Sequence, residues 1–518
     1  MLEKIVNIIV VFALIVLSAA ILANSMTKPV ARDEQMYCAG AVCLAQGKMI
    51  YRDFSYAAQM PYHPLFCAAL FKMFGTTHYL LVVRLLSCVC DILVMVCIVG
   101  VYRHVLKPST TAGTLLGLGA VVLYVFNPLV DYANGYAWNH DDVVFCVALS
   151  LWLFVTADFQ TKPQYWRLAA IGVFLTFATF MRITTVLVEL LFFIVILSLP
   201  AKSIKHRLKT ALPFLAASAI VMIWPVSVIA RAPQAFILNL VKMPTIYGQW
   251  LKEIGMVHNK FALTFACLTT PGYLVLILLT IYLCLAGLVF HRKLKKTNTK
   301  SLWLSALLPV VFFVIALIPP TMWRQYLAVP VPFLVMGLAF PLSFLRDISN
   351  KGNMKKHFKI AVFSMVAGTL VAIFSFPFVL YRIPFALVPE KWIPIEHHKM
   401  AEDIASKTKE PKQILTLAPL LALEGGCDIY TELSAGDIIY RIADTLSPEE
   451  RQITHIVGPR TLAKIAQQSP PSAIIVGTEP SFFAHLEEPL LSLINTSWHM
   501  EVYKNDFYEN DIKAYFKP

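Results

Sequence analysis

The sequence predicts a polytopic α-helical membrane protein with about eleven transmembrane helices, followed by a small α/β domain. Of its 518 residues, 58% are apolar and only 14% are charged, whereas soluble domains hold about 25% charged residues. Apolar runs long enough to cross a bilayer recur as far as residue 381. The charge balance then reverses, from 32 Lys and Arg against 12 Asp and Glu in residues 1–382 to 12 against 19 in residues 383–518. This reversal predicts a domain boundary after residue 382.

Transmembrane helices are expected wherever an apolar run approaches the thickness of the hydrocarbon core. The first run is longer than the core of a cleaved signal peptide, so it predicts an uncleaved signal-anchor. Pro64–Phe74 is apolar but short, which favours a re-entrant or surface helix. The predicted spans are residues 5–24, 79–102, 112–130, 142–157, 167–181, 183–200, 211–229, 263–290, 302–319, 326–344 and 358–381.

The connection after the first span, residues 25–78, is unusually long. Loops of this length usually carry function or their own structure. Glu34–Gln46 has apolar residues at helical spacing and is followed by Gly47, which predicts an amphipathic helix on the membrane surface. Asp33 is then expected at the N-cap of that helix.

The net charge of +13 is a topology signal, because the cations gather in short connections between spans. Examples are Lys202–Lys209, His291–Lys300 and Arg346–Lys359. The positive-inside rule places them in the cytoplasm, with a cytoplasmic N-terminus and an extracytoplasmic C-terminal domain. No nucleic-acid motif accompanies the charge, so we expect no nucleic-acid partner. The ten cysteines lack the spacing of a disulfide framework or a zinc site.

The C-terminal region, residues 383–518, has the pattern of a small α/β domain. Gln413–Ala418 and Ser472–Gly477 are short apolar runs typical of buried strands. Ser447–Gln452 and Thr461–Gln468 are expected to begin helices, the first with a capping box formed by Ser447 and Glu450.

Acidic residues are rare in residues 1–382 and are expensive beside lipid, so those that occur are candidates for function. Asp33 and Glu34 lie about ten residues beyond the first span. Asp33 is a candidate helix cap and a candidate general base whose basicity rises as it is desolvated, and the two roles are compatible. The seven acids in predicted outward segments are Asp33, Glu34, Asp53, Asp131, Asp141, Asp142 and Glu253.

A second polar group, Asn139–Asp142, lies at the predicted outer mouth of the fourth span. It either caps the following helix or forms a second wall of the same outward cavity. His140 is a candidate ligand or proton shuttle, although a lone histidine is more often structural.

Three cations are candidates for binding phosphate. Arg182 lies at an outer turn between two spans, Arg324 in a similar place before Tyr326, and Lys242 in the connection after the seventh span. Each either anchors a helix end by snorkelling or neutralises phosphate oxygens. Acids near outward arginines, beside lipid, suit a reaction in which a lipid phosphate is the leaving group.

Several short motifs follow one another in a recognisable order. They are Arg32-Asp33-Glu34, Gly47 with Tyr51–Phe54, Pro61–Leu65, Leu70–Gly75, Arg84–Ser87, Asp141–Phe145 and Thr179–Arg182. Their order and spacing resemble the GT-C glycosyltransferases, and among them the bacterial branch similar to protein O-mannosyltransferases and aminoarabinose transferases. The resemblance is good over residues 1–200, looser to 382 and architectural beyond. The chain departs from the pattern at His63-Pro64, where many relatives have two prolines.

This resemblance implies a GT-C type enzyme of the bacterial inner membrane. It would transfer a hexose or pentose, with inversion, from a polyprenyl-phosphate donor to a hydroxyl on the extracytoplasmic face. The acceptor would be a glycan, a glycolipid or a protein. The resemblance also implies roles for individual residues. Asp33 matches the general base, with Glu34 as its neighbour. Asp141 or Asp142 matches the second acidic motif, and Arg182 matches a basic position near the donor phosphate.

Other roles are left open by the residues themselves. His140, Tyr326 and His63 are expected to line the cavity or contact the acceptor. No cofactor is required, although carboxylates could hold Mg²⁺ or Mn²⁺. The alternative function is a polytopic transporter or lipid flippase. The acids that such a protein would use lie within spans, and only Asp91 and Glu189 do so here.

Overall fold

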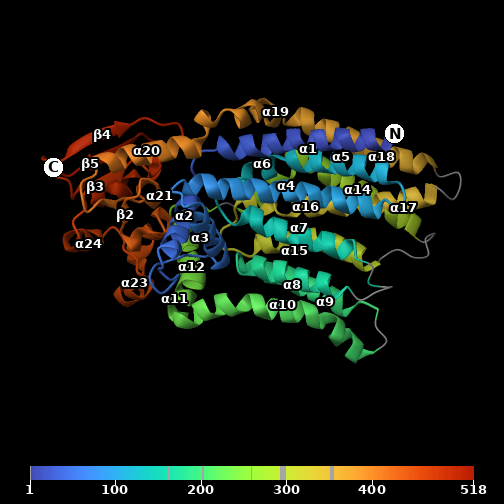
Figure 1. Cartoon of the computed structure of the whole chain (residues 1–518), viewed down its shortest axis with the longest axis horizontal. Coiled ribbons are helices and arrows are strands. Elements are labelled where there is room, and N and C mark those ends of the chain that lie inside the picture. Colours follow the sequence, from blue (N-terminus) through green and yellow to red (C-terminus); the bar gives the residue numbers. More distant parts are fainter. Residues whose placement is uncertain are drawn as a thin grey trace.

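The computed structural model describes residues 2–157, 159, 164–200, 203–257, 259–291, 299–349 and 355–518. A long bundle of helices carries a sheet domain at one end, and the two termini lie at opposite ends of the long axis (Figure 1). Within the described residues, seven helices are long and apolar enough to cross a membrane. Four shorter apolar helices accompany them, so the predicted fold class is confirmed. Most of the predicted cytoplasmic connection His291–Lys300, and part of Arg346–Lys359, lie outside the described residues.

Every predicted span contains at least one helix of the bundle, and two spans are divided. Pro271 starts a new helix, so the run 263–290 becomes α13 and α14, and the run 326–344 is divided into α16 and α17. The bundle consists of α1 (Leu2–Met26), α4 (Tyr79–Val105), α5 (Thr110–Val125), α7 (His140–Val155), α8 (Tyr165–Thr179), α9 (Val186–Leu197), α10 (Ile204–Arg231), α13 (Lys260–Leu268), α14 (Pro271–His291), α15 (Thr299–Leu317), α16 (Pro330–Gly337), α17 (Ala339–Ser349) and α18 (Lys355–Ser375).

The outer surface of the bundle is apolar. On α1, Ile8 and Phe12 are 68% and 67% exposed. Apolar side chains this exposed would be unfavourable in water, and they suit contact with lipid tails. The protein is therefore a multi-pass membrane protein.

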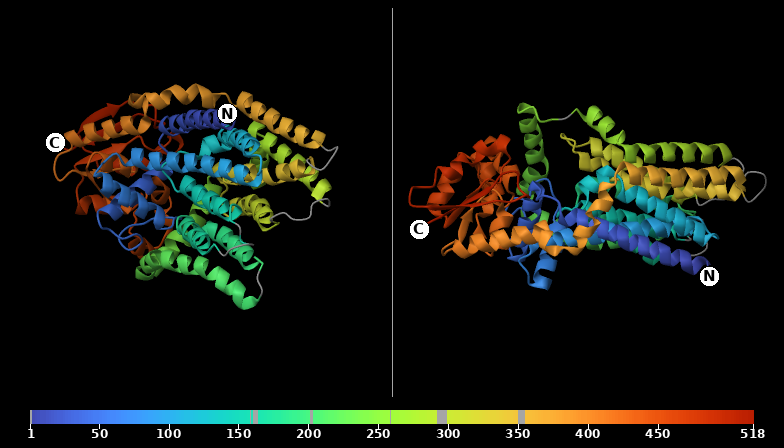
Figure 2. Two further views of the ribbon diagram at one scale, coloured as in Figure 1. Left: turned by 45° about the vertical axis from the view of Figure 1, so that its right-hand side comes forward. Right: turned by 90° about the horizontal axis from the view of Figure 1, so that it is seen from above.

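A layer of short helices separates the bundle from the sheet domain (Figures 1 and 2). It contains α2 (Arg32–Ala45), α3 (Tyr62–Phe74), α11 (Pro233–Ile237) and α12 (Met243–Glu253). The short apolar helix expected at Pro64–Phe74 is present as α3.

The prediction for α2 was wrong in two respects. All ten residues from Glu34 to Cys43 are buried, so α2 is not a surface helix. Its neighbours α3 and α21 (Pro419–Glu424) cover the faces that the amphipathic pattern assigned to lipid and water. In addition, the N-cap is Ala31, and Asp33 lies inside the first turn.

The sheet domain has five strands in the order β2-β1-β3-β5-β4. β2 (Asp428–Ile429), β1 (Gln413–Leu415) and β3 (Ala473–Val476) are parallel, and β5 (Ile512–Phe516) pairs antiparallel with both β3 and β4 (His499–Tyr503). The two predicted strands are β1 and β3, at the centre of the sheet. Helices α20 (Ile393–Lys407), α22 (Asp437–Tyr440), α23 (Pro448–Thr454), α24 (Leu462–Gln468) and α25 (Glu488–Leu491) complete the domain.

Two local predictions for this domain are confirmed. The first is α24, which begins at Leu462 as expected. The second is the capping box of α23, where the backbone N–H of Glu450 donates to the Ser447 hydroxyl at 3.2 Å and the N–H of Ser447 donates to Glu450 at 3.0 Å.

Side chains from α2 and α21 hold the domain against the bundle. The backbone N–H of Leu80, at the start of α4, donates to Glu424 at 2.8 Å. The N–H of Leu420 donates to Gln35 of α2 at 3.0 Å. Because α2 is tied to α4 and to the sheet domain, its first turn has a fixed place between them.

Candidate active site

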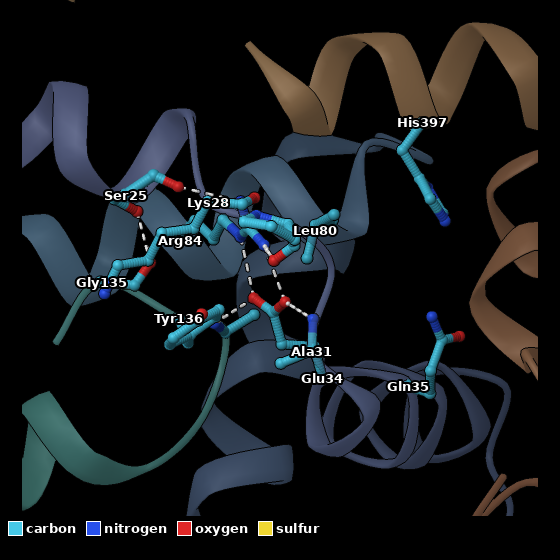
Figure 3. A network of polar contacts seen from close by, with 12 residues as sticks. Ser25, Lys28, Ala31, Glu34, Gln35, Leu80, Arg84, Gly135, Tyr136 and His397 are labelled. Atoms are coloured by element: carbon cyan, nitrogen blue, oxygen red, sulfur yellow. Dashed lines mark hydrogen bonds and ion pairs between the residues drawn. The ribbon is translucent and has the colours of Figure 1, made fainter. Parts of the chain in front are cut away.

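The turn between α1 and α2 is held by one buried arginine of α4 (Figure 3). Arg84 donates two hydrogen bonds to Glu34, both at 2.8 Å. Its other three N–H groups donate to the carbonyl oxygens of Ser25, Lys28 and Pro29 at 2.9, 2.8 and 3.0 Å. All five N–H groups of the guanidinium are therefore used, and they fix the position at which α2 begins.

Glu34 is equally committed. Besides Arg84, its carboxylate accepts from the backbone N–H groups of Ala31 at 2.7 Å and Ala137 at 2.6 Å. The side chain is fully buried. A carboxylate that binds substrate or a metal needs a free oxygen, but both oxygens of Glu34 are occupied by protein donors. The geometry gives Glu34 a positioning role.

Asp33, the residue before Glu34, differs from it in hydrogen bonding and in burial. Its carboxylate makes no hydrogen bond or ion pair with any described residue, and the side chain is only partly buried. Burial nevertheless raises the pKa of Asp33 to about 6, with a further increase from the charge of Asp437. Arg32 and Arg182 act in the opposite direction. At neutral pH this group is a carboxylate that is free to accept a proton, and it is more basic than an ordinary aspartate.

Arg182 approaches the same place from the connection between α8 and α9. It donates to the Asn139 side-chain oxygen at 3.0 Å, and Asn139 is itself held by the Met181 carbonyl at 2.8 Å and by Gln59 at 3.0 Å. The other N–H groups of Arg182 have no hydrogen-bond partner in the described part of the chain. The guanidinium is thus oriented at one end and open to an anion at the other.

The charge of Arg182 reaches a ring of side chains from three elements. It acts on Asp33 and Tyr37 of α2, on His63 of α3 and on Tyr326. Tyr326 belongs to the short helix η3 (Arg324–Leu327). The Tyr37 and His63 rings pack edge to face, with centroids 5.1 Å apart. Three of the candidate residues, Asp33, His63 and Tyr326, thus lie within electrostatic reach of the fourth, Arg182.

The two acids of the second motif face different partners. The Asp142 carboxylate lies 3.4 Å from Nε2 of His63 and accepts from the Cys90 thiol at 3.1 Å. Asp141 accepts from the backbone N–H of Gly135 at 2.8 Å. Burial, together with the charge of Arg182, lowers the pKa of His63 to about 3, so the imidazole is neutral at physiological pH. Only Asp142 therefore contacts the ring of side chains around Arg182.

The remaining predicted residues are placed less centrally. His140 is buried in the first turn of α7, within reach of the charge of Arg182. Arg324 is exposed, and its charge acts on Cys267 of α13. Lys242 forms an ion pair with Glu450 of the sheet domain. The structure thus does not place Lys242 or Arg324 beside Asp33.

Sequence reasoning missed three residues of the site. Arg84 belongs to the motif Arg84–Ser87, but it was assigned no role from the sequence. A lone arginine near the end of a span nevertheless predicts a nearby acid. Tyr37 lies one helical turn after Asp33 on the same face of α2, which the spacing alone could have shown. Asp437 acts from the sheet domain, and no pattern in the sequence connects it to the membrane region.

The described residues contain no group of three His, Cys, Asp or Glu side chains that could hold a metal ion. The carboxylates that were candidates for Mg²⁺ or Mn²⁺ are dispersed among separate protein partners. Glu34 binds Arg84, Asp142 lies by His63, and Asp141 binds Gly135.

Part of the sequence matches a known protein family. Residues 58–229 match the family model of dolichyl-phosphate-mannose-protein mannosyltransferases. No curated protein sequence matches the chain. The structure is similar to that of ArnT from Cupriavidus metallidurans bound to undecaprenyl phosphate, with a TM-score of 0.62 and 14% identity, over 98% of each chain.

A second similar structure is the Archaeoglobus fulgidus oligosaccharyltransferase in complex with Zn and sulfate. The TM-score is 0.53 at 11% identity, over 96% of this chain and 72% of that one. The same enzyme tethered to an acceptor peptide gives a TM-score of 0.51 at 11% identity, over 96% and 73% of the two chains. The resemblance to the GT-C glycosyltransferases is confirmed by the family match and by a fold shared along almost the whole chain.

Proposed function

We propose that this chain, which has the GT-C fold, is a glycosyltransferase that moves a sugar from a polyprenyl-phosphate donor to an acceptor hydroxyl. The observation that carries the proposal is the arrangement of Asp33 and Arg182. A free carboxylate with a raised pKa and an arginine with unused N–H groups lie within electrostatic reach of each other. The similar ArnT structure is described as bound to undecaprenyl phosphate, which supports a donor of this class.

In the proposed reaction Asp33 removes the proton from the acceptor hydroxyl. The hydroxyl oxygen forms a bond to the anomeric carbon of the sugar as the bond from that carbon to the phosphate oxygen breaks. The phosphate leaves with the bonding electrons, and the guanidinium of Arg182 stabilises the charge that it gains. A single displacement of this kind inverts the anomeric carbon. Asp33 then holds the proton and releases it to solvent.

The neighbouring groups support these two. Tyr37 and Tyr326 lie within electrostatic range of Arg182 and supply hydroxyl donors to a phosphate there. Asp142 orients the neutral imidazole of His63, which lies edge-on to Tyr37. Glu34 and Arg84 fix the first turn of α2, so the Asp33 carboxylate is preorganised.

The site lies at the sheet-domain end of the bundle, and the starts of α10, α15 and α18, which follow the cationic connections in the sequence, lie toward the other end (Figure 1). By the positive-inside rule the reaction takes place on the extracytoplasmic face of the bacterial inner membrane. The prenyl tail would then remain in the lipid while its phosphate reaches Arg182.

Transport or lipid flipping is less well supported by the geometry. Asp91, within α4, accepts hydrogen bonds from Tyr124 at 2.7 Å and Asn134 at 2.6 Å. Glu189, within α9, accepts from the hydroxyls of Thr176 and Thr179. The carboxylates of Asp91 and Glu189 thus both accept hydrogen bonds from neighbouring side chains. Proton-coupled uptake into vesicles without any glycosylated product would favour a transporter.

Mass spectrometry of envelope glycoconjugates from cells with and without the gene tests the proposal and identifies the product. The purified protein in lipid nanodiscs then reports release of polyprenyl phosphate from a panel of polyprenyl-phosphate sugars, with and without EDTA. We expect Asp33→Asn and Arg182→Ala to abolish the glycoconjugate difference. Asp53→Asn and Arg52→Ala are matched controls, because this exposed ion pair lies in the same connection. Identical glycoconjugates in the two strains would refute the assignment.

A further inference from the structure

A cavity of about 340 Å³ lies between the turn that precedes α2 and the sheet domain. Its size is at the lower end of the range for small-molecule sites, roughly 300–1,000 Å³. Residues from the start of α2 form one wall, and residues of the sheet domain form the other. The polar residues of the lining are Arg32, Gln35, Asp437, Thr478, Asp506, Tyr508 and Glu509.

This cavity lies beside the first turn of α2, which carries the proposed base. Arg32 and Gln35 line it and flank Asp33 in the sequence of α2, although Asp33 is not itself a lining residue. Asp437, on the opposite wall, adds to the effect of burial in raising the pKa of Asp33, and Arg182 lowers that pKa. The carboxylate of Asp33 is therefore within electrostatic reach of both the cavity wall and the cation assigned to the donor phosphate. A general base has to reach the acceptor hydroxyl, and a cavity beside its helix turn is a place from which that hydroxyl can approach it.

The cavity wall is built on the sheet domain by a buried ion-pair network. Arg441 donates to Asp437 at 2.6 Å and also pairs with Glu479. Arg32 approaches the same Asp437 oxygen at 3.7 Å. Gln35 is held by the N–H of Leu420 and by the Tyr508 hydroxyl, both at 3.0 Å. These bonds fix the two walls relative to each other, so the cavity is a preformed feature of the domain interface.

The lining favours hydroxyl or ammonium groups over anions. It contains the acids Asp437, Asp506 and Glu509 against the single cation Arg32. Carboxylate and amide oxygens accept hydrogen bonds from sugar hydroxyls, and an excess of negative charge repels phosphate or carboxylate.

We infer that this cavity binds a neutral or cationic saccharide unit of the acceptor, and that it holds the attacking hydroxyl beside Asp33. The inference rests on the proposed function, because it assigns the acceptor side of the same reaction. The acceptor is then a hydroxyl-rich glycan. The sugar unit next to its reacting hydroxyl carries no phosphate.

Binding of small probes to the full-length protein in nanodiscs tests the inference without turnover. The probes are cellobiose, the cationic disaccharide of glucosamine, and glucose 6-phosphate. We expect the cationic probe to bind tightest and the phosphorylated probe at least about tenfold more weakly. The variant Asp506→Asn/Glu509→Gln should weaken binding of the cationic probe about tenfold, since it removes two acids from the cavity wall. Both residues are exposed, so the variant should fold normally.

The control is Glu390→Gln/Glu449→Gln, which removes two exposed acids outside the cavity. This control should bind every probe as the native protein does. Asp33→Asn should retain probe binding while turnover is lost, because the base is not needed to hold the sugar. Unchanged binding in the Asp506/Glu509 variant, or tighter binding of glucose 6-phosphate than of the other probes, would overturn the subsite. Full turnover in Asp33→Asn with probe binding intact would instead refute the proposed function and leave the subsite standing.

Discussion

Glu34 and Arg84 form a buried ion pair with two parallel hydrogen bonds of 2.8 Å, and this pair determines which of two adjacent acids is free. Glu34 is saturated by protein donors, whereas the carboxylate beside it, Asp33, makes no hydrogen bond or ion pair with the described residues. Because the same guanidinium also binds three carbonyl oxygens before α2, the pair places the whole first turn. The chemistry assigned to Asp33 therefore depends on a contact that never touches substrate.

Breaking this pair should destabilise the protein strongly. Glu34→Gln leaves the Arg84 charge buried without a counterion, and removing one partner of a buried pair costs about 3–5 kcal/mol. Arg84→Lys should be comparably harmful, because an ammonium cannot replace five fixed N–H groups. Thermal unfolding in detergent measures the effect.

The exposed pair of Arg52 and Asp53 is the control for that experiment. Its bonds are as short, at 2.8 and 2.6 Å, but both side chains reach solvent. Asp53→Asn should change the unfolding free energy by less than about 1 kcal/mol. The double variant Glu34→Gln/Arg84→Met should lose less than the sum of its single variants. Equal effects in the buried and exposed pairs would contradict the positioning role.

Asp33→Asn should remove catalysis and leave the fold unchanged. The native carboxylate makes no hydrogen bond or ion pair with the described residues that the amide would break, so unfolding should occur at the native temperature. Loss of a positioned base typically lowers the rate about 10²–10⁴-fold. Release of polyprenyl phosphate is the readout. A fully active Asn variant would exclude Asp33 as the base.

The pH dependence of the rate should report the pKa of Asp33. This pKa is raised to about 6, and the base acts only when it is deprotonated. The rate should therefore be constant above pH 6 and should fall about tenfold for each unit below it. His63 adds no second step in this range, because burial lowers its pKa to about 3. The residual rate of Asp33→Asn should be flat across the same pH range, and an unchanged inflection in that variant would assign the titration to another group.

The sequence located both acids at the start of α2, and only the family resemblance assigned the base to Asp33 rather than Glu34. Periodicity reports on a single helix, whereas the partner that neutralises Glu34 is fifty positions away on α4. The pKa of Asp33 is raised by burial in the folded protein and then by Asp437 of the sheet domain, and neither effect can be seen in the local sequence. The same limit explains α2 itself. Its pattern fits a surface helix, and only the packing of α3 and α21 against it buries it.

The sheet domain shows which sequence patterns predict a strand or helix cap without knowledge of the tertiary contacts. β3 is buried along its whole length, and its apolar run predicted it. The two-residue β2 and the half-exposed β4 lack such a run, so they escaped prediction. The capping box at Ser447 was predictable because both partners lie within one turn.

Asp141 and Asp142 should separate into a structural and a functional residue. Asp142 lies against His63, one of the side chains within reach of Arg182, whereas Asp141 holds the backbone at Gly135. That backbone is tight, because Gly135 has a φ of +84° and its position would place a Cβ 2.9 Å from Ser25. Asp142→Asn should thus lower turnover at near-native stability. Asp141→Asn should mainly lower the unfolding temperature, by the equivalent of about 1–3 kcal/mol. The opposite pattern would reverse the two roles.

Arg182 should control use of the donor. Its guanidinium makes a single hydrogen bond to the protein, at Asn139, so most of its N–H groups remain for a phosphate. Arg182→Ala should lower turnover by about 10²–10³-fold, as expected for removal of a group that stabilises developing charge. Arg182→Lys should recover part of the rate, because a point charge replaces a fork of N–H donors. Initial rates at varied donor concentration, with Arg52→Ala as control, separate this effect from misfolding. Native donor kinetics in Arg182→Ala would exclude Arg182 as the phosphate contact and would direct attention to Arg324, the exposed arginine two residues before Tyr326.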